Sequence, residues 1–286
     1  MSSEVSLSVD RRERRSSRLN LRRKLLAVST RRAAVSILVA LLVWQLGATG
    51  PSWLGARIPI IGSAPSPLAV AEAWSHLLAD PNYWRSWYLS LLRVLFGFVS
   101  ATLVGVPFGL LLAVNPTFRA ISYPVFELLR PIPPLAWVPA SIIFWPTQEL
   151  SIAFVIFIGA FYTIVINVLG GAEAIDIRLI QTARSMGASR WNIFSRLILP
   201  GVAPSIRVGM EVAIGITWEV VVAAEMISSG SGGAGGGLGF FIWNSYIGGS
   251  YPDIVVGMIS IGIAGYLSSA AVRFVAARLT PWRGGR

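Results

Sequence analysis

Long apolar runs separated by short polar connections limit the possible folds of this sequence more than any other feature. Crossing a hydrocarbon core about 30 Å thick as a helix takes about 20 apolar residues. The third of the apolar stretches is interrupted by prolines at 131, 133, 134 and 139. Six stretches reach or approach the required length, namely residues 33–49, 87–114, 118–145, 150–170, 204–227 and 254–276. The pattern predicts an all-α polytopic membrane protein with about six transmembrane helices.

Composition supports a membrane protein. Hydrophobic residues make up 54% of the 286 residues and charged residues only 13%, whereas about a quarter of the residues in soluble domains are charged. The sequence has no Cys, which excludes disulfides and thiol chemistry. About thirty residues with ten Arg or Lys precede the first apolar run, unlike the short basic region of a secretory signal.

The distribution of arginine predicts the orientation. The net charge is +11, and the basic residues lie mainly between or outside the apolar runs, which favours lipid headgroups over nucleic acid as their partner. The connections expected outside are residues 50–86, the turn near Thr147 and residues 228–253. Their only Arg or Lys residues are Arg57 and Arg85. Both termini are therefore predicted to be cytoplasmic. The predicted organisation has three parts: a basic segment 1–32, a transmembrane domain 33–280 and a tail 281–286. The basic segment either lies on the membrane surface or is a disordered tail.

The connection between the fourth and fifth runs, residues 173–200, is polar but strongly patterned. Apolar residues recur at helical spacing on both sides of Gly187. Gly187 suits a left-handed residue that ends the first helix, and Pro200 is expected to stop the second. This coupling segment is predicted to form a cytoplasmic helix–turn–helix that needs a partner surface.

The coupling segment also carries a family signature. Gly187, nine further residues and Leu197-Ile198-Leu199-Pro200 resemble the signature loop of ABC-importer permeases, G-x9-I-x-L-P preceded by E-A-A. This chain has Gln181-Thr182-Ala183 where that pattern has E-A-A, and Leu197 in place of Ile. Several segments resemble the nitrate/sulfonate/taurine branch, namely Ser90–Arg93, Leu128–Pro139, Ala183–Ser189 and Ala223–Met226. The resemblance as a whole extends over about residues 90–269.

The resemblance implies a permease subunit in a bacterial inner membrane, with a small anion or sulfonate such as nitrate, taurine or alkanesulfonate as solute. Its partners would be cytoplasmic ABC ATPase subunits, a second permease copy and an extracytoplasmic solute-binding protein, with no cofactor, metal or catalytic residue. The residues implied in ATPase docking are Gln181, Thr182, Ala183, Arg184, Ser185, Met186, Gly187, Ala188, Ser189, Arg190, Trp191 and Pro200. The chain cannot itself form a P-loop, because its single lysine, Lys24, has no nearby glycine.

Ionisable groups inside a bilayer usually mark pathways or ion pairs. Glu211, Glu219 and Glu225 in the fifth run would repel an anionic solute unless they are paired. A zwitterionic or cationic solute therefore stays possible. Arg93, near the outer end of the second run, is expected to reach the interface. Glu211 and Glu219, two turns apart, are expected to point into the bundle. The candidates for the solute pathway are Glu127, Arg130, Trp137, Glu211, Trp218, Glu219 and Glu225.

Several alternatives stay open from the sequence. Glu127 and Arg130 are three apart and could form a local pair, and Trp218 could simply be packed. The glycine-rich stretch 228–239 predicts either a flexible loop or a backbone cradle for an anion. Two rival functions are an ion-coupled secondary transporter, for which no internal duplication is seen, and an intramembrane enzyme, which lacks Cys and has only His76.

Overall fold

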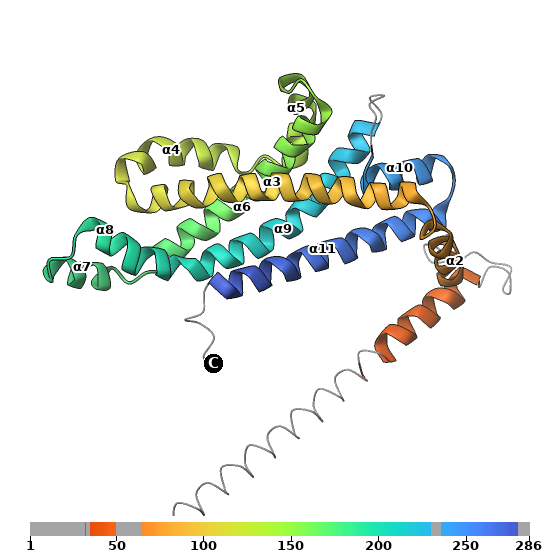
Figure 1. The fold of residues 1–286 in the computed structure, drawn as a ribbon, viewed down its shortest axis with the longest axis horizontal. Helices are drawn as coiled ribbons and strands as arrows, with labels where there is room; N and C mark the ends of the chain where they lie inside the picture. Colours follow the sequence, from red (N-terminus) through yellow and green to blue (C-terminus); the bar gives the residue numbers. More distant parts are fainter. Residues whose placement is uncertain (1–31, 33–34, 50–63, 230–235, 280–286) are drawn as a thin grey trace, which may run out of the picture. The chain divides into compact units, whose positions relative to one another are not determined.

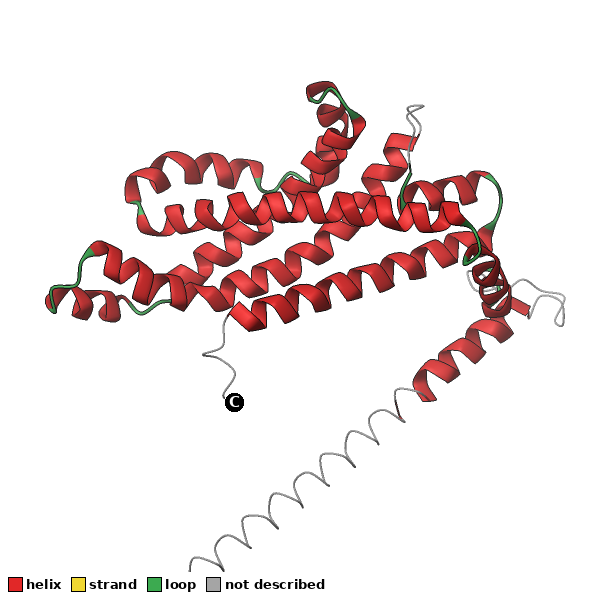
Figure 2. Cartoon of the chain, in the orientation of Figure 1, coloured by secondary structure: helices red, strands yellow, loops and turns green. Residues whose placement is uncertain are grey.

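A computed structural model describes residues 32, 35–49, 64–229 and 236–279. All regular structure in this part of the chain is helical, with no strand (Figure 2). The basic segment up to residue 31, the tail after 279 and residues 230–235 of the glycine-rich stretch lie outside the described residues. The chain divides into two compact units, residues 1–72 and 73–286, which are treated separately.

The first unit contains the apolar helix Val35–Thr49 and the beginning of α2 (Pro67–Leu77). The side chains on the Val35–Thr49 helix are mostly exposed, as expected for a helix that meets lipid. The apolar pattern did not predict α2, which falls in a predicted outer connection. Its start is nevertheless marked locally, because Ser66 Oγ accepts a hydrogen bond from the N–H of Ala69 at 3.3 Å.

Four long helices build the second unit: α3 (Pro81–Val114), α6 (Gln148–Glu173), α9 (Leu199–Ser229) and α11 (Tyr251–Leu279). Among the described residues, three segments are long and apolar enough to cross a membrane, namely α3, α6 and the first 28 residues of α11. α6 packs against both α3 and α9 (Figure 1). Of the apolar window of α6, 56% is buried, against 22% for α11, so α6 is the core helix and α11 is peripheral.

The contact between α3 and α6 depends on small residues. A Cβ on Gly97 would lie 2.4 Å from Ile156, and one on Gly109 would lie 2.8 Å from Val168. Real Cβ atoms do not approach so closely, so the two backbones come together only because these positions lack a side chain. Such small-residue contacts are typical of helix packing in membranes, where dispersion contacts hold the helices together.

The third predicted span is a broken segment. It consists of α4 (Pro116–Leu129), a proline-rich break, a 3₁₀ turn η2 (Pro134–Trp137) and α5 (Val138–Phe144). The predicted interruption is confirmed: proline lacks a backbone donor, and Pro133, which precedes Pro134, is extended with ψ of 138°. At 1.5 Å per residue α4 is only about 21 Å long, so neither helix could span the membrane alone. The total of six spans stays a prediction.

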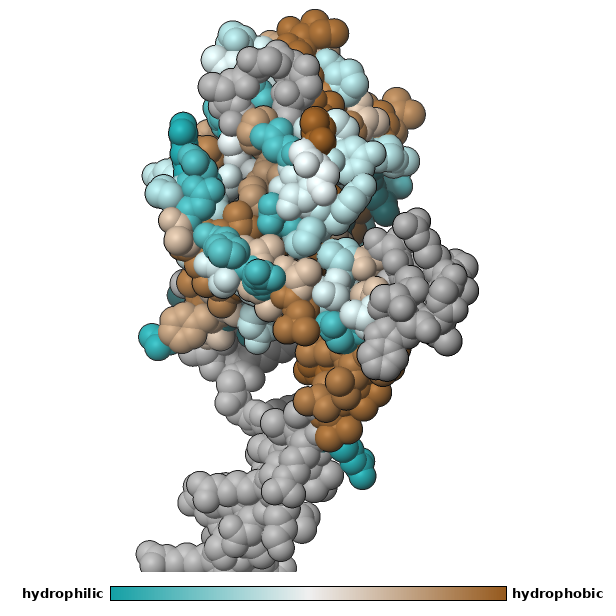
Figure 3. All heavy atoms as spheres, turned by 90° about the vertical axis from the view of Figure 1, so that its right-hand side faces the viewer, coloured by the Kyte–Doolittle hydropathy of each residue, from teal (hydrophilic) through white to brown (hydrophobic). Residues whose placement is uncertain are grey.

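A short helix, α10 (Leu238–Ile247), was also missed by the sequence analysis. It follows the glycine-rich stretch and packs against α3, α9 and α11. The end of the second unit that carries α10 presents a mixture of hydrophilic and apolar side chains (Figure 3). Such a mixed surface suits the end of a helix bundle, where the bilayer gives way to water.

The coupling segment forms α7 (Ile177–Ser185) and α8 (Arg190–Ile193), followed by a π-helical turn η3 (Phe194–Ile198). The pair lies beyond the ends of α6 and α9, at one extremity of the second unit (Figure 1). The predicted helix pair between the fourth and fifth apolar runs is confirmed. The ends of α6 and α9 therefore determine where the helix pair lies relative to the bundle.

Candidate functional site

Local side-chain caps hold the coupling segment. The carboxylate of Asp176 accepts a hydrogen bond from the N–H of Arg178 at 2.9 Å and so begins α7. Ser189 Oγ accepts one from the N–H of Asn192 at 3.2 Å and so begins α8. Each cap satisfies an N–H that has no partner within its helix. The helix pair is therefore defined by its own sequence rather than by packing on the bundle.

Gly187 joins the two helices in the left-handed conformation that the sequence predicts. Its φ is +80°. The N–H of Ala188 donates to the carbonyl of Ala183 at 3.0 Å, and the N–H of Gly187 donates to the carbonyl of Arg184 at 2.9 Å. These are the two bonds of a Schellman motif, which ends a helix at a left-handed glycine.

The expectation that Pro200 stops the second helix is wrong. The chain stays helical from Arg190 through the π turn at Phe194–Ile198 and into α9, which begins at Leu199. Pro200 lacks an N–H but follows directly on the π turn, where the N–H of Leu199 donates to the carbonyl of Phe194 and the α-helical pattern of donors is already interrupted. The coupling segment is therefore continuous with a core helix.

The outer surface of the coupling segment combines apolar and basic residues. Met186 is 79% exposed and Trp191 is 70% exposed. Arg178, Arg184 and Arg190 are exposed as well. Ile177 and Leu179 of α7 are exposed too, at 60% and 54%. Exposed apolar side chains grouped among polar ones mark a surface that interacts with a protein or with the membrane.

A pocket of about 370 Å³ opens on the second unit between α6, α9 and the proline-rich break that follows α4. Arg130 supplies its only charged group, and α6 supplies the polar side chains. Thr163 Oγ1 donates to the carbonyl of Gly159 at 3.1 Å, and Asn167 Nδ2 donates to the carbonyl of Thr163 at 2.8 Å. The lining residues are Arg130, Ile132, Pro134, Gly159, Tyr162, Thr163, Ile166, Asn167 and Ile216.

Of the predicted pathway residues, only Arg130 lines this pocket. Arg130 and Glu127 form the local pair left open by the sequence, at a long 3.4 Å and with both side chains nearly half exposed. Trp137 lies on η2, where its ring contacts Phe154 at 6.5 Å between centroids. The Trp137 indole N–H is buried and has no hydrogen-bond partner within the described part of the chain.

The acids of the predicted fifth span are separated from one another. Glu211 accepts from Arg207 Nε at 2.9 Å, four residues apart on α9. The sequence analysis missed this pair, although its i,i+4 spacing was the available signal. Glu219 is exposed on the surface of the chain rather than inside its bundle. Trp218 is packed inside the chain, which was one of the two alternatives left open by the sequence. It is buried, and its Nε1 donates to Ser268 Oγ of α11 at 2.8 Å.

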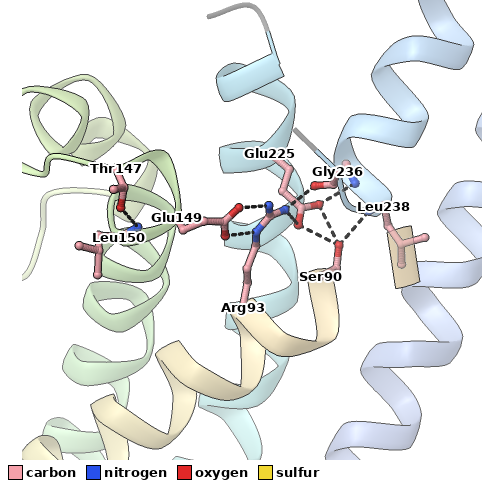
Figure 4. Close-up of polar contacts among 9 residues, drawn as sticks. Ser90, Arg93, Thr147, Glu149, Leu150, Glu225, Gly236 and Leu238 are labelled. Atoms are coloured by element: carbon pink, nitrogen blue, oxygen red, sulfur yellow. Dashed lines mark hydrogen bonds and ion pairs between the residues drawn. The ribbon is translucent and has the colours of Figure 1, made fainter. Parts of the chain in front are cut away.

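Arg93 lies in a buried ion network, and the expectation that it reaches the interface is wrong. Its guanidinium forms two hydrogen bonds with Glu149 at the start of α6, at 2.5 and 2.8 Å (Figure 4). Its Nη1 also donates to Glu225 Oε1 of α9 at 2.8 Å and to the carbonyl of Gly236. One arginine of α3 thus joins α6, α9 and the residues that lead into α10. The distance along the chain between these partners hid the network from the sequence analysis.

The end of the glycine-rich stretch cradles an anion that belongs to the protein itself. The carboxylate of Glu225 accepts from the N–H of Gly239 at 2.9 Å and from Ser90 Oγ at 2.8 and 2.9 Å. Ser90 in turn accepts from the N–H of Leu238 at 2.8 Å (Figure 4). The described end of this stretch therefore binds a carboxylate through its backbone, which favours the cradle alternative there. Within the described residues no group of three His, Cys, Asp or Glu could hold a metal ion.

A family model and the related proteins found by comparison agree on one family for this chain. Residues 105–284 match the model of the family described as "Binding-protein-dependent transport system inner membrane component". The nitrate import permease protein NrtB of Leptolyngbya laminosa is 34% identical over 257 residues, covering 87% of this chain and 87% of that protein. The taurine transport system permease protein TauC of Escherichia coli is 31% identical over 256 residues, covering 87% of this chain and 88% of that protein.

A solved structure supports the fold. One chain of the MetNI methionine ABC transporter, in an inward-facing conformation, has a TM-score of 0.59 and 21% identity. The match covers 71% of this chain and 98% of that chain. The predicted all-α membrane fold and the resemblance stated from the sequence are both confirmed.

Proposed function

The chain belongs to the family of binding-protein-dependent transport system inner membrane components, and from this premise we propose how it works within its importer. It is the membrane-spanning permease subunit of an ATP-binding-cassette importer. In our proposal two copies line one pathway in a bacterial inner membrane, with both termini in the cytoplasm. Two separate ATPase subunits hydrolyse ATP, and an extracytoplasmic binding protein delivers the solute.

The observation that carries this proposal is the exposed tip of the coupling segment. Met186 and Trp191 are the most exposed large apolar residues of the helix pair, which also exposes Ile177 and Leu179 of α7 among basic and polar residues. The partner that covers them needs an apolar floor with acidic groups around it, to match Arg184 and Arg190. Because the segment continues without interruption into α9, a push on α8 would be transmitted directly to a core helix. We infer that residues 181–196 and Pro200 form the connection to the ATPase.

The orientation has support in one ion pair. Arg119, in the first turns of α4, lies 2.6 Å from Glu173 at the end of α6. This pair joins α4 to the end of α6 that leads into the coupling segment, in the part of the chain that the arginine distribution assigns to the cytoplasm. The proposed cytoplasmic end thus carries Arg119 together with the exposed arginines of the coupling segment, in agreement with the positive-inside rule.

We propose a small oxyanion or a sulfonate as the solute. The related permeases named above serve nitrate and taurine transport. The electrostatic objection from the acids of α9 is reduced, because Glu211 is paired with Arg207 and Glu225 with Arg93. An anion therefore does not meet three unpaired carboxylates on this helix.

Copurification tests the docking role. We expect Met186→Ser and Trp191→Ala each to reduce the amount of ATPase subunit that copurifies with the tagged chain by about tenfold, because truncating an anchor residue of an interface costs more than about 1 kcal/mol. Met258→Ser is the matched control, since Met258 is also exposed but lies on α11. Undiminished copurification of the ATPase with both coupling-segment variants would contradict the proposal.

A further inference from the structure

The polar pocket lies in the middle of the apolar helices, where polar groups are costly. Its α6 residues, from Gly159 to Asn167, belong to the central turns of the helix Gln148–Glu173, and Ile216 lies near the middle of α9. The pocket volume of about 370 Å³ compares with about 30 Å³ for one water in the liquid. The space is thus large enough for an ion of several heavy atoms with part of its hydration shell.

The polar groups around the pocket are better suited to an anion than to a cation. Arg130 is the only charged residue among those that line it. A guanidinium has five N–H donors, and the one ion pair of Arg130, with Glu127, is long at 3.4 Å. Tyr162 adds a phenol hydroxyl, and Asn167 has a second amide N–H besides the one given to Thr163. Planar guanidinium donors match the geometry of two oxygens on one anionic group.

No carboxylate lines the pocket. On the neighbouring helix α9, Glu211 and Glu225 are neutralised by ion pairs with Arg207 and Arg93, and Glu219 is exposed at the surface. Glu127 is the acid that pairs with Arg130, and the contact between them is long at 3.4 Å. The pocket therefore presents the positive charge of Arg130, which Glu127 compensates only in part, in a wall that is otherwise largely apolar.

We propose that this pocket is a transit site for the solute and that Arg130 is its specificity-determining residue, holding the oxygens of an oxyanion or sulfonate group. The inference rests on the proposed function, because it assumes that the chain lines an anion pathway. Tyr162 and Asn167 supply further neutral donors for the anion beside the guanidinium. The pair with Glu127 is long enough for an arriving anion to replace the carboxylate without a large loss.

The test measures uptake and ATP hydrolysis together in the complete transporter. The chain is reconstituted in proteoliposomes with its ATPase subunits and its binding protein, and uptake of nitrate, taurine and bicarbonate is measured with ATP inside. For Arg130→Gln we expect a loss of uptake of about tenfold or more, since hydrogen bonds to charged groups contribute about 1.5–3 kcal/mol. ATP hydrolysis stimulated by the loaded binding protein should stay within about twofold of the unsubstituted complex.

Further variants separate specificity from folding. Arg130→Lys should recover part of the uptake, because it keeps the charge and loses the planar donors. Tyr162→Phe should raise the KM for uptake by a smaller factor than Arg130→Gln does. Arg273→Gln is the matched control, since it removes a positive charge from α11, which does not line the pocket. Its uptake should equal that of the unsubstituted complex.

The outcomes separate the two proposals. If the unsubstituted complex takes up one of the three anions and Arg130→Gln does so with the same KM and rate, the pocket inference is overturned while the proposed function stands. If the unsubstituted complex takes up none of them but transports a cationic solute with ATP, the proposed solute class fails, and the pocket inference fails with it. A loss of both uptake and stimulated ATP hydrolysis in Arg130→Gln, with Arg130→Lys equally inactive, indicates a structural role and also overturns the inference.

Discussion

Arg93 Nη1 lies 2.8 Å from Glu225 Oε1, and this ion pair joins α3 to α9 where α10 begins. The side chain of Arg93 is 5% exposed and that of Glu225 is 0% exposed. Without Glu225 the buried guanidinium would keep only Glu149, which is 60% exposed, as its carboxylate partner, and breaking a buried ion pair costs more than the pair itself contributes. The network therefore holds the ends of several helices in one arrangement.

We expect Glu225→Gln to lower the free energy of unfolding by about 1–3 kcal/mol, because the buried guanidinium of Arg93 would lose its buried carboxylate partner and keep only Glu149. Thermal unfolding of the purified complex in detergent measures this. Glu149→Gln is the control, since Glu149 pairs with the same guanidinium but is 60% exposed, so water compensates most of its loss. An equal or larger loss of stability for Glu149→Gln would contradict the account.

Gly237 makes a second prediction about the same network. Its φ of +122° favours glycine, and a Cβ there would lie 2.3 Å from the Glu225 carboxylate. Gly237→Ala should therefore displace Glu225, and its destabilisation should overlap with that of Glu225→Gln. In a double-mutant cycle we expect a coupling energy of about 0.5–3 kcal/mol. Additive losses would show that the two positions act independently.

Gly187→Ala tests the turn of the coupling segment by itself. Nothing lies within 4 Å of a Cβ at this position, so the substitution acts only through the backbone at φ +80°. A left-handed residue with a side chain costs about 1–2 kcal/mol, so we expect the affinity for the ATPase subunit to fall by about tenfold. Gly170→Ala is the matched control, because it is also free of contacts but lies in α6 without a positive φ. The account is contradicted if both variants bind the ATPase alike.

Trp218→Phe separates packing from a pathway role. Trp218 Nε1 donates to Ser268 Oγ at 2.8 Å and ties α9 to α11. Losing this bond should lower the free energy of unfolding by about 1 kcal/mol and leave the KM for the solute unchanged. Uptake assays and thermal unfolding of the same preparation measure both quantities. A changed KM at unchanged stability would return Trp218 to the pathway.

Local sequence signals predicted the features that depend on neighbouring residues. The long helices follow from apolar run length, and the left-handed conformation of Gly187 follows from the break in helical spacing around it. The role of Pro200 was not predictable, because a π turn lets a helix continue where an α-helical pattern would end. Neither was α10, whose short length and glycine-rich approach resemble a loop.

Contacts between distant parts of the chain were the features that the sequence could not supply. Arg93 and Glu225 are 132 positions apart, and no periodicity relates them. The pocket was missed for another reason, because its α6 residues are neutral and lie inside a predicted span. A signal did exist, since Gly159, Thr163 and Asn167 recur every four residues and so share one face of a helix.

The most direct test of the central claim compares the energy sources that drive uptake. The chain alone and the complex with its ATPase subunits and binding protein are reconstituted in liposomes, and solute accumulation is measured with ATP or with an ion gradient. We predict accumulation only by the complete complex, only with ATP, and loss of it when the coupling segment is disrupted at Gly187. Accumulation by the chain alone, driven by an ion gradient, would contradict the assignment as a permease subunit of an ATP-driven importer.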